Sequence, residues 1–353
     1  MAIFEEINQD TVPQPIQQNT RDARTGSASE IRTQDIASQR GEESLRPKTL
    51  QDIIGMQKEK DKLKILLESA KIREDVVDHI LFYGPPGLGK TTFGNALAAE
   101  HGTNFVFTSG PGISSKAELA SILTNLQRGD FLFIDEIHRL NKIIEEFLYP
   151  VLEDFSMDMT LGKGSLAKVM KLDLPKFTLI GATTQIGLIS APLRDRFGSI
   201  FKLDFYSLQD LTSIVLSYAE KFGVGIEAKA AFEVARRSRG TARIAIRNLK
   251  RVRDYSLACG EPKISVQTTL LAFIELGIDD FGIDSVMHKY LDAIISNFEG
   301  GPVGLSNIAA SIYEDARTIE EVYEPYLIKI GFVKRTNQGR VVTKKCMEYV
   351  HRE

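Results

Sequence analysis

The chain has 353 residues, 43% of them apolar and 26% charged, so it is long enough to bury more than one hydrophobic core. Its formal net charge of −3 excludes a globally basic surface for nucleic acids. The two cysteines, Cys259 and Cys346, have no CxxC partner, which excludes a disulfide framework or zinc site. Without an 18-residue apolar run or a leader pattern, we expect no membrane partner and a reducing, cytoplasmic setting.

The first 44 residues are polar and lack any sustained apolar period, which is typical of a disordered tail. The globular pattern begins at Leu45, with an amphipathic helix expected near residues 56–72. The apolar run 79–83 that follows predicts a strand.

Residues 84–91, GPPGLGKT, come directly after that strand and fit the phosphate-binding pattern G-x-x-x-x-G-K-[ST]. Such a loop turns backbone N–H groups around a triphosphate, places Lys90 on the terminal phosphates and offers the Thr91 hydroxyl to Mg²⁺. A chance glycine-rich turn is the alternative. A helix is expected to follow over residues 90–101.

A second apolar run, 131–134, ends in Asp135 and Glu136 and predicts a buried parallel strand with two carboxylates at its end. In a P-loop ATPase, Asp135 would hold Mg²⁺ through water and Glu136 would polarise the attacking water. A solvated strand end is the alternative when the pair is taken alone. Further strands near 104–108 and 177–180 alternate with helical stretches, so we expect an α/β domain with a parallel sheet and helices on both faces.

Between these elements, residues 157–174 alternate apolar and polar side chains on both sides of Gly162-Lys163-Gly164, which predicts an inserted β-hairpin. Methionines in it suit both a core and an adaptable interface, so a hairpin packed on the sheet and a protruding, partner-binding hairpin both stay open.

Two smaller domains follow. Residues 207–279 read as helical throughout, like a small lid, with Arg243, Arg247 and Arg251 spaced by four residues; each is either a ligand contact or a solvated surface residue. Residues 280–353 predict helices at 286–298 and 305–313. A third helix would be capped by Thr318 and Glu321 or restarted at Pro325, and a basic hairpin would follow. Three helices and a hairpin make a winged helix.

The chain contains, in order, LRPKTLQDIIG, HILFYGPPGLGKTT, LTNLQRGDFLFIDEIHRLN, YPVLEDFSMD, LDLPKFTLIGATT, APLRDRFG, RRSRGTARIA, GPVGLSNIAASI, VYEPYLIKIGF and RTNQGR. Together these segments resemble the RuvB family, the bacterial AAA+ motors of Holliday-junction branch migration. The similarity extends from about Leu45 to Thr343. It implies a large AAA+ ATPase domain at 45–206, the lid at 207–279 and the winged helix at 280–353.

The resemblance also implies roles for individual residues. Thr183 matches the polar sensor of the attacking water, Arg196 the arginine finger offered to a neighbouring subunit, and Arg335 and Arg340 the DNA contacts of the wing. The implied ATP-binding residues are Leu45, Arg46, Gly87, Gly89, Lys90, Thr91, Thr92, Glu153, Asp154, Phe155, Arg196, Tyr206 and Arg243.

Five positions depart from the family pattern. Gln185 replaces an arginine, Ala242 and Ile246 alter the lid motif, and Asn337 and Gln338 alter the wing motif, whose positive charge Gln338 lowers by one. None of these changes removes a triphosphate contact.

The implied function is that of an ATP- and Mg²⁺-dependent DNA translocase, a homohexamer around duplex DNA at a Holliday junction. Its hairpin 157–174 would bind a RuvA-like protein, and a RuvC-like resolvase would join the complex. A clamp-loader-like or recombination-associated AAA+ ATPase shares the P-loop but lacks the basic winged helix. A non-motor, ATP-gated DNA-binding regulator would need neither Glu136 nor Arg196.

Overall fold

The structure is a computed structural model that describes residues 45–161 and 168–350. The predicted tail, residues 1–44, lies outside this range, as does the turn of the predicted hairpin. All elements below belong to the compact unit that begins at Pro47. Within the described residues, no helix combines the length and apolar character needed to cross a membrane.

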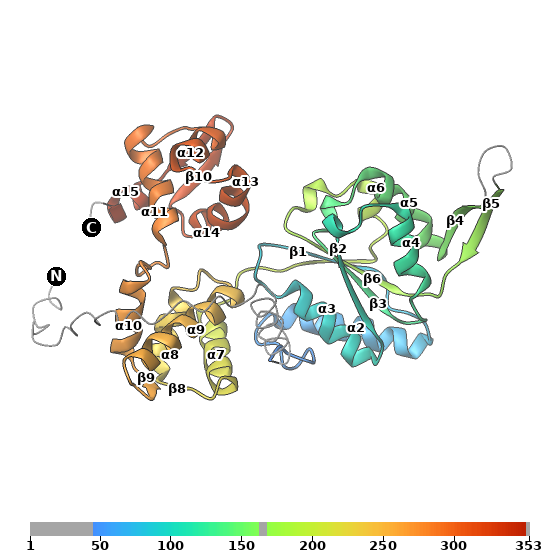
Figure 1. Ribbon diagram of the computed structural model, residues 1–353, viewed down its shortest axis with the longest axis horizontal. Helices are drawn as coiled ribbons and strands as arrows, with labels where there is room; N and C mark the ends of the chain where they lie inside the picture. The colour runs from blue at the N-terminus through green and yellow to red at the C-terminus, as the bar shows by residue number, and fades with distance from the viewer. Residues whose placement is uncertain (1–44, 162–167, 351–353) are drawn as a thin grey trace, which may run out of the picture. The chain divides into compact units, whose positions relative to one another are not determined.

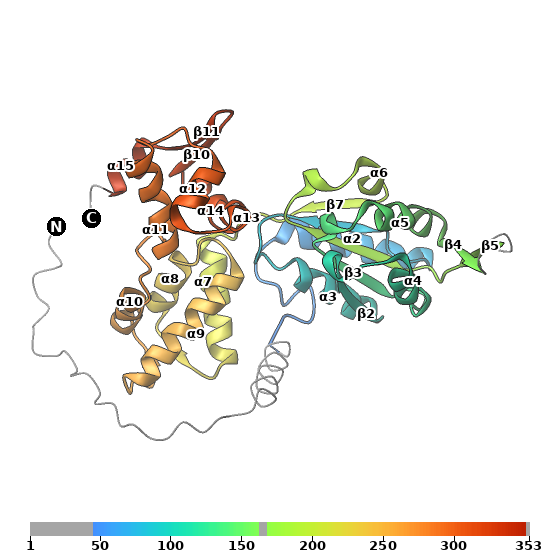
Figure 2. The same cartoon turned by 45° about the horizontal axis from the view of Figure 1, so that its top comes forward.

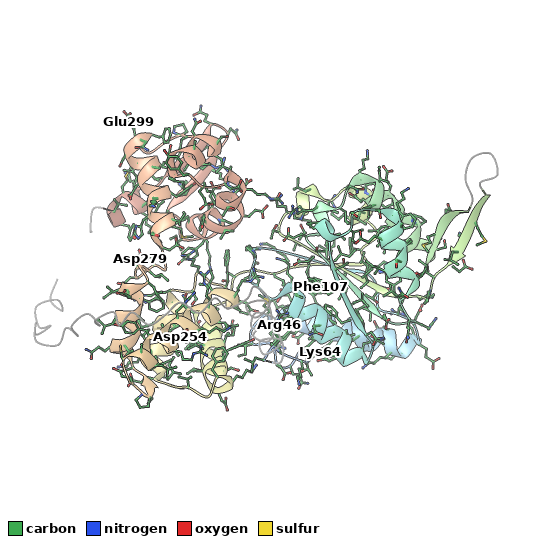
Figure 3. The ribbon with its side chains drawn as sticks, viewed as in Figure 1. Arg46, Lys64, Phe107, Asp254, Asp279 and Glu299 are labelled. Carbon is green, nitrogen blue, oxygen red and sulfur yellow. The ribbon has the colours of Figure 1, made fainter. Side chains whose placement is uncertain are left out.

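A five-stranded parallel sheet forms the centre of the ATPase region, in the order β2-β3-β6-β1-β7. The predicted strands near 104–108, 131–134 and 177–180 are present. The fifth strand, β7, was not predicted, because it is only four residues long and two of these residues are exposed. On the outer strand β2, Phe107 stacks on Phe133 and stays partly exposed (Figure 3). The strands are β1 (Ile80–Tyr83), β2 (Phe105–Ser109), β3 (Phe131–Asp135), β6 (Thr178–Thr183) and β7 (Ser199–Lys202).

Alternating strand residues supply two cores, one on each face of the sheet. Phe131 and Phe133 face the first core, whereas Leu132 and Ile134 face the second. Helices α2 (Gln57–Arg73) and α3 (Lys90–His101) cover the first face. Helices α4 (Lys116–Thr124) and α5 (Lys142–Asp154) cover the second, as Figure 1 shows. The expected α/β layering is thereby confirmed.

The inserted hairpin consists of antiparallel strands β4 (Ser156–Leu161) and β5 (Lys168–Asp173). At its base Met157 and Leu174 are buried in the second core, but Met170 is 49% exposed. Figures 1 and 2 both show the hairpin projecting away from the sheet. Of the two alternatives, the protruding hairpin is therefore the one observed.

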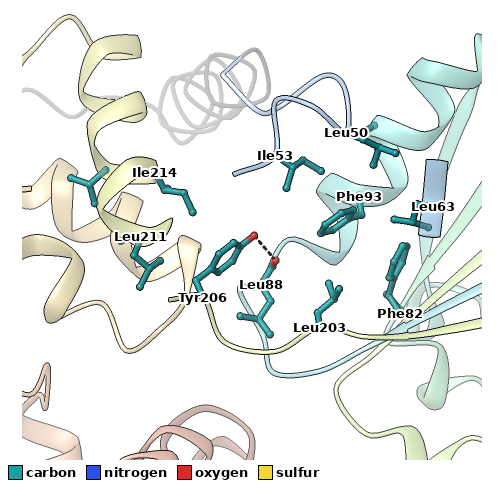
Figure 4. Packing of buried hydrophobic residues seen from close by; sticks show 14 of the residues in the cluster. Leu50, Ile53, Leu63, Phe82, Leu88, Phe93, Leu203, Tyr206, Leu211 and Ile214 are labelled. Atoms are coloured by element: carbon teal, nitrogen blue, oxygen red, sulfur yellow. Dashed lines mark hydrogen bonds between the residues drawn. The ribbon is translucent and has the colours of Figure 1, made fainter. Parts of the chain in front are cut away.

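The lid consists of helices α7 (Leu208–Lys221), α8 (Ala228–Arg236), α9 (Ala242–Ala258) and α10 (Val266–Glu275). Ser207, Thr241 and Ser265 cap three of them by accepting backbone N–H groups of the first turn. Two-residue strands β8 (Gly225–Ile226) and β9 (Lys263–Ile264) also pair in this region, which the helical prediction missed. Lid and sheet share one continuous core near Tyr206, Leu211 and Ile214 (Figure 4).

The C-terminal region has its own core and is a winged helix. The capping box predicted from Thr318 and Glu321 is wrong, because Asp315 is the N-cap and accepts the Thr318 N–H at 2.9 Å. The helix restarts at Glu324 with Pro325 in its first turn, where a missing N–H costs nothing. The elements are α11 (Ser285–Asp292), the π-helical turn 293–297, α12 (Leu305–Ile312), α13 (Ala316–Thr318), the π-helical turn 319–323, α14 (Glu324–Lys329), β10 (Val333–Thr336), β11 (Gly339–Val342) and α15 (Lys344–Val350). The last helix was not predicted.

Candidate nucleotide site

The loop between β1 and α3 has the backbone that a phosphate cradle requires. Gly84, Gly87 and Gly89 all have positive φ, and a Cβ on Gly84 would lie 2.3 Å from the carbonyl oxygen of Leu203. Gly89 is the N-cap of α3 and supplies no side-chain acceptor, so the first N–H groups of the helix stay available. An open helix N-terminus with glycine approach is an anion site.

Lys90 is buried at this loop without an ion-pair partner among the described residues. Its Nζ donates to the carbonyl oxygens of Gly84 at 2.8 Å and Pro85 at 3.1 Å. Burial lowers the pKa of Lys90 to about 8, an effect that the charges of Asp135 and Glu136 only partly oppose. A buried ammonium ion with neutral ligands lacks an anion, and a phosphate would supply one.

The lid contributes two predicted residues to the same loop. The Tyr206 hydroxyl donates to the carbonyl oxygen of Leu88 at 3.1 Å (Figure 4). The Arg243 N–H donates to the carbonyl oxygen of Gly87 at 3.2 Å. The exposed Arg243 guanidinium has no hydrogen bond or ion pair in the described chain, and its charge acts to lower the pKa of Lys90. Two cations therefore lie at the loop, whereas no hydrogen bond or ion pair among the described residues joins Arg247 or Arg251 to it.

Glu136 follows β3 in a strained, left-handed conformation with φ 49° and ψ 44°. Gly110 permits this arrangement, because a Cβ there would lie 2.5 Å from the Glu136 carbonyl oxygen. Burial and the neighbouring charge of Asp135 raise the pKa of Glu136. A carboxylate with a raised pKa accepts protons more readily than an ordinary glutamate, which suits a base that acts on water.

Thr91 and Asp135, the predicted Mg²⁺ contacts, are compatible with that ion. One Asp135 oxygen accepts the Glu136 N–H at 3.0 Å, which orients the carboxylate and leaves its other oxygen for a water ligand. The described residues hold no group of three or more His, Cys, Asp or Glu suited to a metal. Mg²⁺ differs from metals held by such groups because it takes few protein ligands and relies on phosphates and waters.

Thr183 ends β6 beside the Glu136 carboxylate, and a histidine that sequence reasoning missed lies between them. His138 Nδ1 is 2.9 Å from Thr183 Oγ1 and 3.4 Å from Glu136 Oε2. Its position two residues after Glu136 was the only sequence indication. The three side chains come together because β3 and β6 are adjacent parallel strands.

Arg196 and the predicted residues at the end of α5 form a separate group. Arg196 Nη2 lies 3.0 Å from Glu153 Oε2, and the guanidinium lies over the Tyr149 ring at 4.6 Å. Asp154 pairs with Lys171, and Phe155 packs against His79 and Phe177. None of these side chains contacts the P-loop of its own chain within the described residues.

Leu45 and Arg46 precede the compact unit that begins at Pro47. Leu45 is half-buried and Arg46 is exposed. Their place in an adenine pocket stays a prediction.

In the wing, Arg335 and Arg340 lie directly opposite each other on β10 and β11. Both turn to the buried carboxylate of Glu324, with Nε distances of 2.7 and 2.9 Å, and both also approach Glu320. The Tyr290 hydroxyl donates to Glu324 as well, at 3.0 Å. The predicted DNA contacts are thus already part of an internal ion-pair network, while Lys334 and Lys344 beside them are exposed.

A P-loop after β1, a carboxylate pair at the end of β3 in the same parallel sheet, a helical lid and a winged helix in one chain define an AAA+ ATPase with a DNA-binding type of C-terminal domain. Three family models match in order: the Holliday junction DNA helicase RuvB P-loop domain at residues 45–203, the RuvB AAA lid domain at 206–279 and the RuvB C-terminal winged helix domain at 280–351. The chain belongs to the RuvB family. It is therefore a nucleotide-binding enzyme that hydrolyses ATP.

Solved structures agree with this assignment. The chain is 48% identical to the Thermotoga maritima RuvB Holliday junction branch migration motor, with a TM-score of 0.80 over 87% of this chain and 98% of that one. A lysine-to-arginine mutant and a proline-to-glycine mutant of the same Thermotoga maritima protein match with TM-scores of 0.81 at the same identity and coverage. The clamp-loader and static-regulator alternatives are not supported.

Proposed function

We propose that this chain is the ATP-driven motor of Holliday-junction branch migration, a translocase that acts in recombination and repair as a homohexamer around duplex DNA in the cytoplasm. The observation that carries the proposal is the buried Lys90, which lies at an open helix N-terminus near Arg243; neither cation has an ion-pair partner among the described residues. The 48% identity with a branch migration motor over nearly all of its length supports the same function.

In this proposal, the N–H groups from Gly87 to Thr92 and the Lys90 ammonium bind the triphosphate of ATP. Thr91, and Asp135 through water, hold Mg²⁺, which neutralises charge on the phosphates. Glu136 accepts a proton from the attacking water, and Thr183 orients that water. Tyr206 and Arg243 let the lid respond to the nucleotide, because both contact the loop through its backbone.

The group around Arg196 completes the site of a neighbouring subunit. Its guanidinium is held by Glu153 and Tyr149 at the end of α5, away from its own P-loop, so in a ring it is available to the next nucleotide. Glu153, Asp154 and Phe155 would border that interface. This arrangement makes the hexamer a requirement of catalysis.

The hairpin β4–β5 would bind a RuvA-like protein, and a RuvC-like resolvase would act on the same junction. The projection of the hairpin from the sheet and the exposed Met170 support the contact with a RuvA-like protein. The wing, with Arg335, Arg340 and the exposed Lys334 and Lys344, would contact DNA phosphates and so position the ring without reading bases.

A synthetic four-way junction with a fluorophore and a quencher on opposite arms tests the function. With a RuvA-family protein and ATP, the chain should separate the arms, and duplex DNA should stimulate phosphate release. A Glu136→Gln protein should bind the junction but leave it unmoved. Wild-type protein that hydrolyses ATP and binds the junction yet never separates the arms would contradict the motor assignment.

A further inference from the structure

The buried side chain of His138 connects three elements of the chain. His138 lies in the 3₁₀ turn after Glu136, with only 1% of its side chain exposed. Nδ1 faces Thr183 Oγ1 at 2.9 Å and Glu136 Oε2 at 3.4 Å. On the other side of the ring, Nε2 lies 3.2 Å from Nη2 of Arg317, on α13 of the winged helix.

These contacts determine which nitrogen of the imidazole carries the proton. An arginine guanidinium only donates hydrogen bonds, so His138 Nε2 must accept one. The proton of the neutral ring therefore lies on Nδ1, which donates to Thr183 Oγ1. Burial and the charge of Arg317 both lower the pKa of His138, in agreement with a neutral ring.

The same logic fixes the direction of the Thr183 hydroxyl. Its oxygen accepts the backbone N–H of Gln185 at 2.9 Å and the Nδ1–H of His138. A hydroxyl has two acceptor lone pairs and one proton, so only its O–H remains for a third partner. Thr183 can therefore act toward a water or a phosphate oxygen only as a hydrogen-bond donor, which is the role proposed for it.

Glu321 of the winged helix holds Arg317 and also makes a second contact with the end of β6. The Arg317 Nε donates to Glu321 Oε1 at 2.6 Å, and the same oxygen accepts Nε2 of Gln185 at 2.7 Å. Gln185, one of the departures from the family pattern, thereby links the end of β6 to the winged helix: its backbone N–H donates to Thr183 and its side-chain amide donates to Glu321.

We propose that His138 is a positioning residue for ATP hydrolysis: Arg317 selects its tautomer, and the ring in turn aims the Thr183 hydroxyl and restrains the Glu136 carboxylate. The inference rests on the catalytic roles proposed above for Thr183 and Glu136. It also gives the winged helix a hydrogen-bonded connection to the catalytic strand ends.

Amide substitutions separate the two ring nitrogens in the full-length protein. His138→Asn places an amide near the Nδ1 position, whereas His138→Gln places it near Nε2. We expect His138→Ala to lower the kcat of DNA-stimulated ATP hydrolysis by about 10²-fold, the effect of misplaced catalytic groups, with little change in KM for ATP. His138→Asn should recover most of that loss and His138→Gln much less. Arg317→Ala should lower kcat by a smaller factor.

The matched control is His101→Ala, at the opposite end of α3 from Lys90, which should leave kcat unchanged. Thermal unfolding identifies a variant that fails to fold. If His138→Ala does not fold, the difference in kcat between His138→Asn and His138→Gln tests the inference instead. Equal rates for these two, an unchanged kcat in His138→Ala or an unchanged kcat in Arg317→Ala would overturn the inference. Normal hydrolysis by Glu136→Gln would instead refute the catalytic assignment on which it rests.

Discussion

Lys90 and Arg243 at the P-loop and Arg335 and Arg340 in the wing are two pairs of cations with opposite surroundings. The first pair has no carboxylate partner within the described residues, and burial depresses the pKa of Lys90. The second pair surrounds Glu324, whose side chain is 0% exposed, with Glu320 alongside. Charge alone, as seen in the sequence, does not distinguish them.

The difference separates a binding site from a structural network. Cations that lack an anion are ready for a ligand that the chain does not contain, such as a triphosphate. Cations that neutralise a buried carboxylate stabilise the fold first, because removing them leaves a charge in a medium that solvates it poorly. Arg335 still has 42% of its side chain exposed, whereas the exposed Lys334 and Lys344 have no ion-pair partner among the residues that the structure describes.

Replacing Arg196 should have the largest effect. Arginine fingers contribute roughly 10³- to 10⁵-fold in rate, so we expect Arg196→Ala to lose hydrolysis by that order while still binding ATP. The proposed role in the next subunit predicts complementation: Arg196→Ala and Lys90→Ala proteins, each inactive alone, should regain phosphate release when assembled together. Mixed rings that stay inactive would show that Arg196 does not act between subunits.

Replacing Glu136 should come next. General bases contribute about 10²- to 10⁴-fold, and an amide in place of this carboxylate cannot take up a proton. We expect Glu136→Gln to bind ATP nearly as well as wild type but to release phosphate slower by this order. A nucleotide titration beside a phosphate-release assay gives both values. Full hydrolysis by the variant would remove Glu136 from the mechanism.

Local sequence patterns predicted the backbone of the P-loop region well. The residues of the P-loop are consecutive in the chain, and the helix expected at 90–101 has the bounds observed for α3. The site around His138 could not be predicted in this way, because its partners Thr183 and Arg317 are 45 and 179 residues away in the chain. The buried Glu324 was hidden for a similar reason: a carboxylate in a helical stretch reads as solvent-exposed until the fold places two arginines around it.

The wing provides a prediction about stability. Replacing both Arg335 and Arg340 with alanine leaves Glu324 buried without a cation, a loss of about 3–5 kcal/mol in the free energy of unfolding. Replacing Lys334 and Lys344 should change that free energy by no more than about 0.5 kcal/mol. Thermal or denaturant unfolding of the full chain compares the two double variants.

The lysine variant then tests DNA contact without the confounding loss of structure. If both lysines contact phosphates, the slope of log affinity against log salt should fall by about 0.9 for each contact removed. ATP hydrolysis without DNA should not change. An unchanged slope in a folded double-lysine variant would mean that neither lysine contacts a phosphate, so that any phosphate contact of the wing is made by Arg335 and Arg340.

The smallest expected effect concerns protons taken up with ATP. In the free chain the pKa of Lys90 is lowered to about 8, because burial outweighs nearby carboxylates. Bound phosphates favour the charged ammonium and raise that pKa. Above pH 8 the free chain has lost part of the Lys90 proton, and the nucleotide complex regains it. ATP binding should therefore weaken as pH rises through this range, and the protein should take up a fraction of a proton for each ATP bound.

Calorimetric titration at pH 8.5, in two buffers with different ionisation enthalpies, measures this uptake directly. A Lys90→Arg variant is the control, since a guanidinium stays charged at this pH and should take up nothing through this group. Equal uptake in both proteins would assign the proton to another residue. No uptake in wild type would mean that Lys90 is fully charged before ATP binds. The missing carboxylate partner would then not lower the pKa of Lys90, and the cations of the P-loop and of the wing would differ less in protonation than their surroundings indicate.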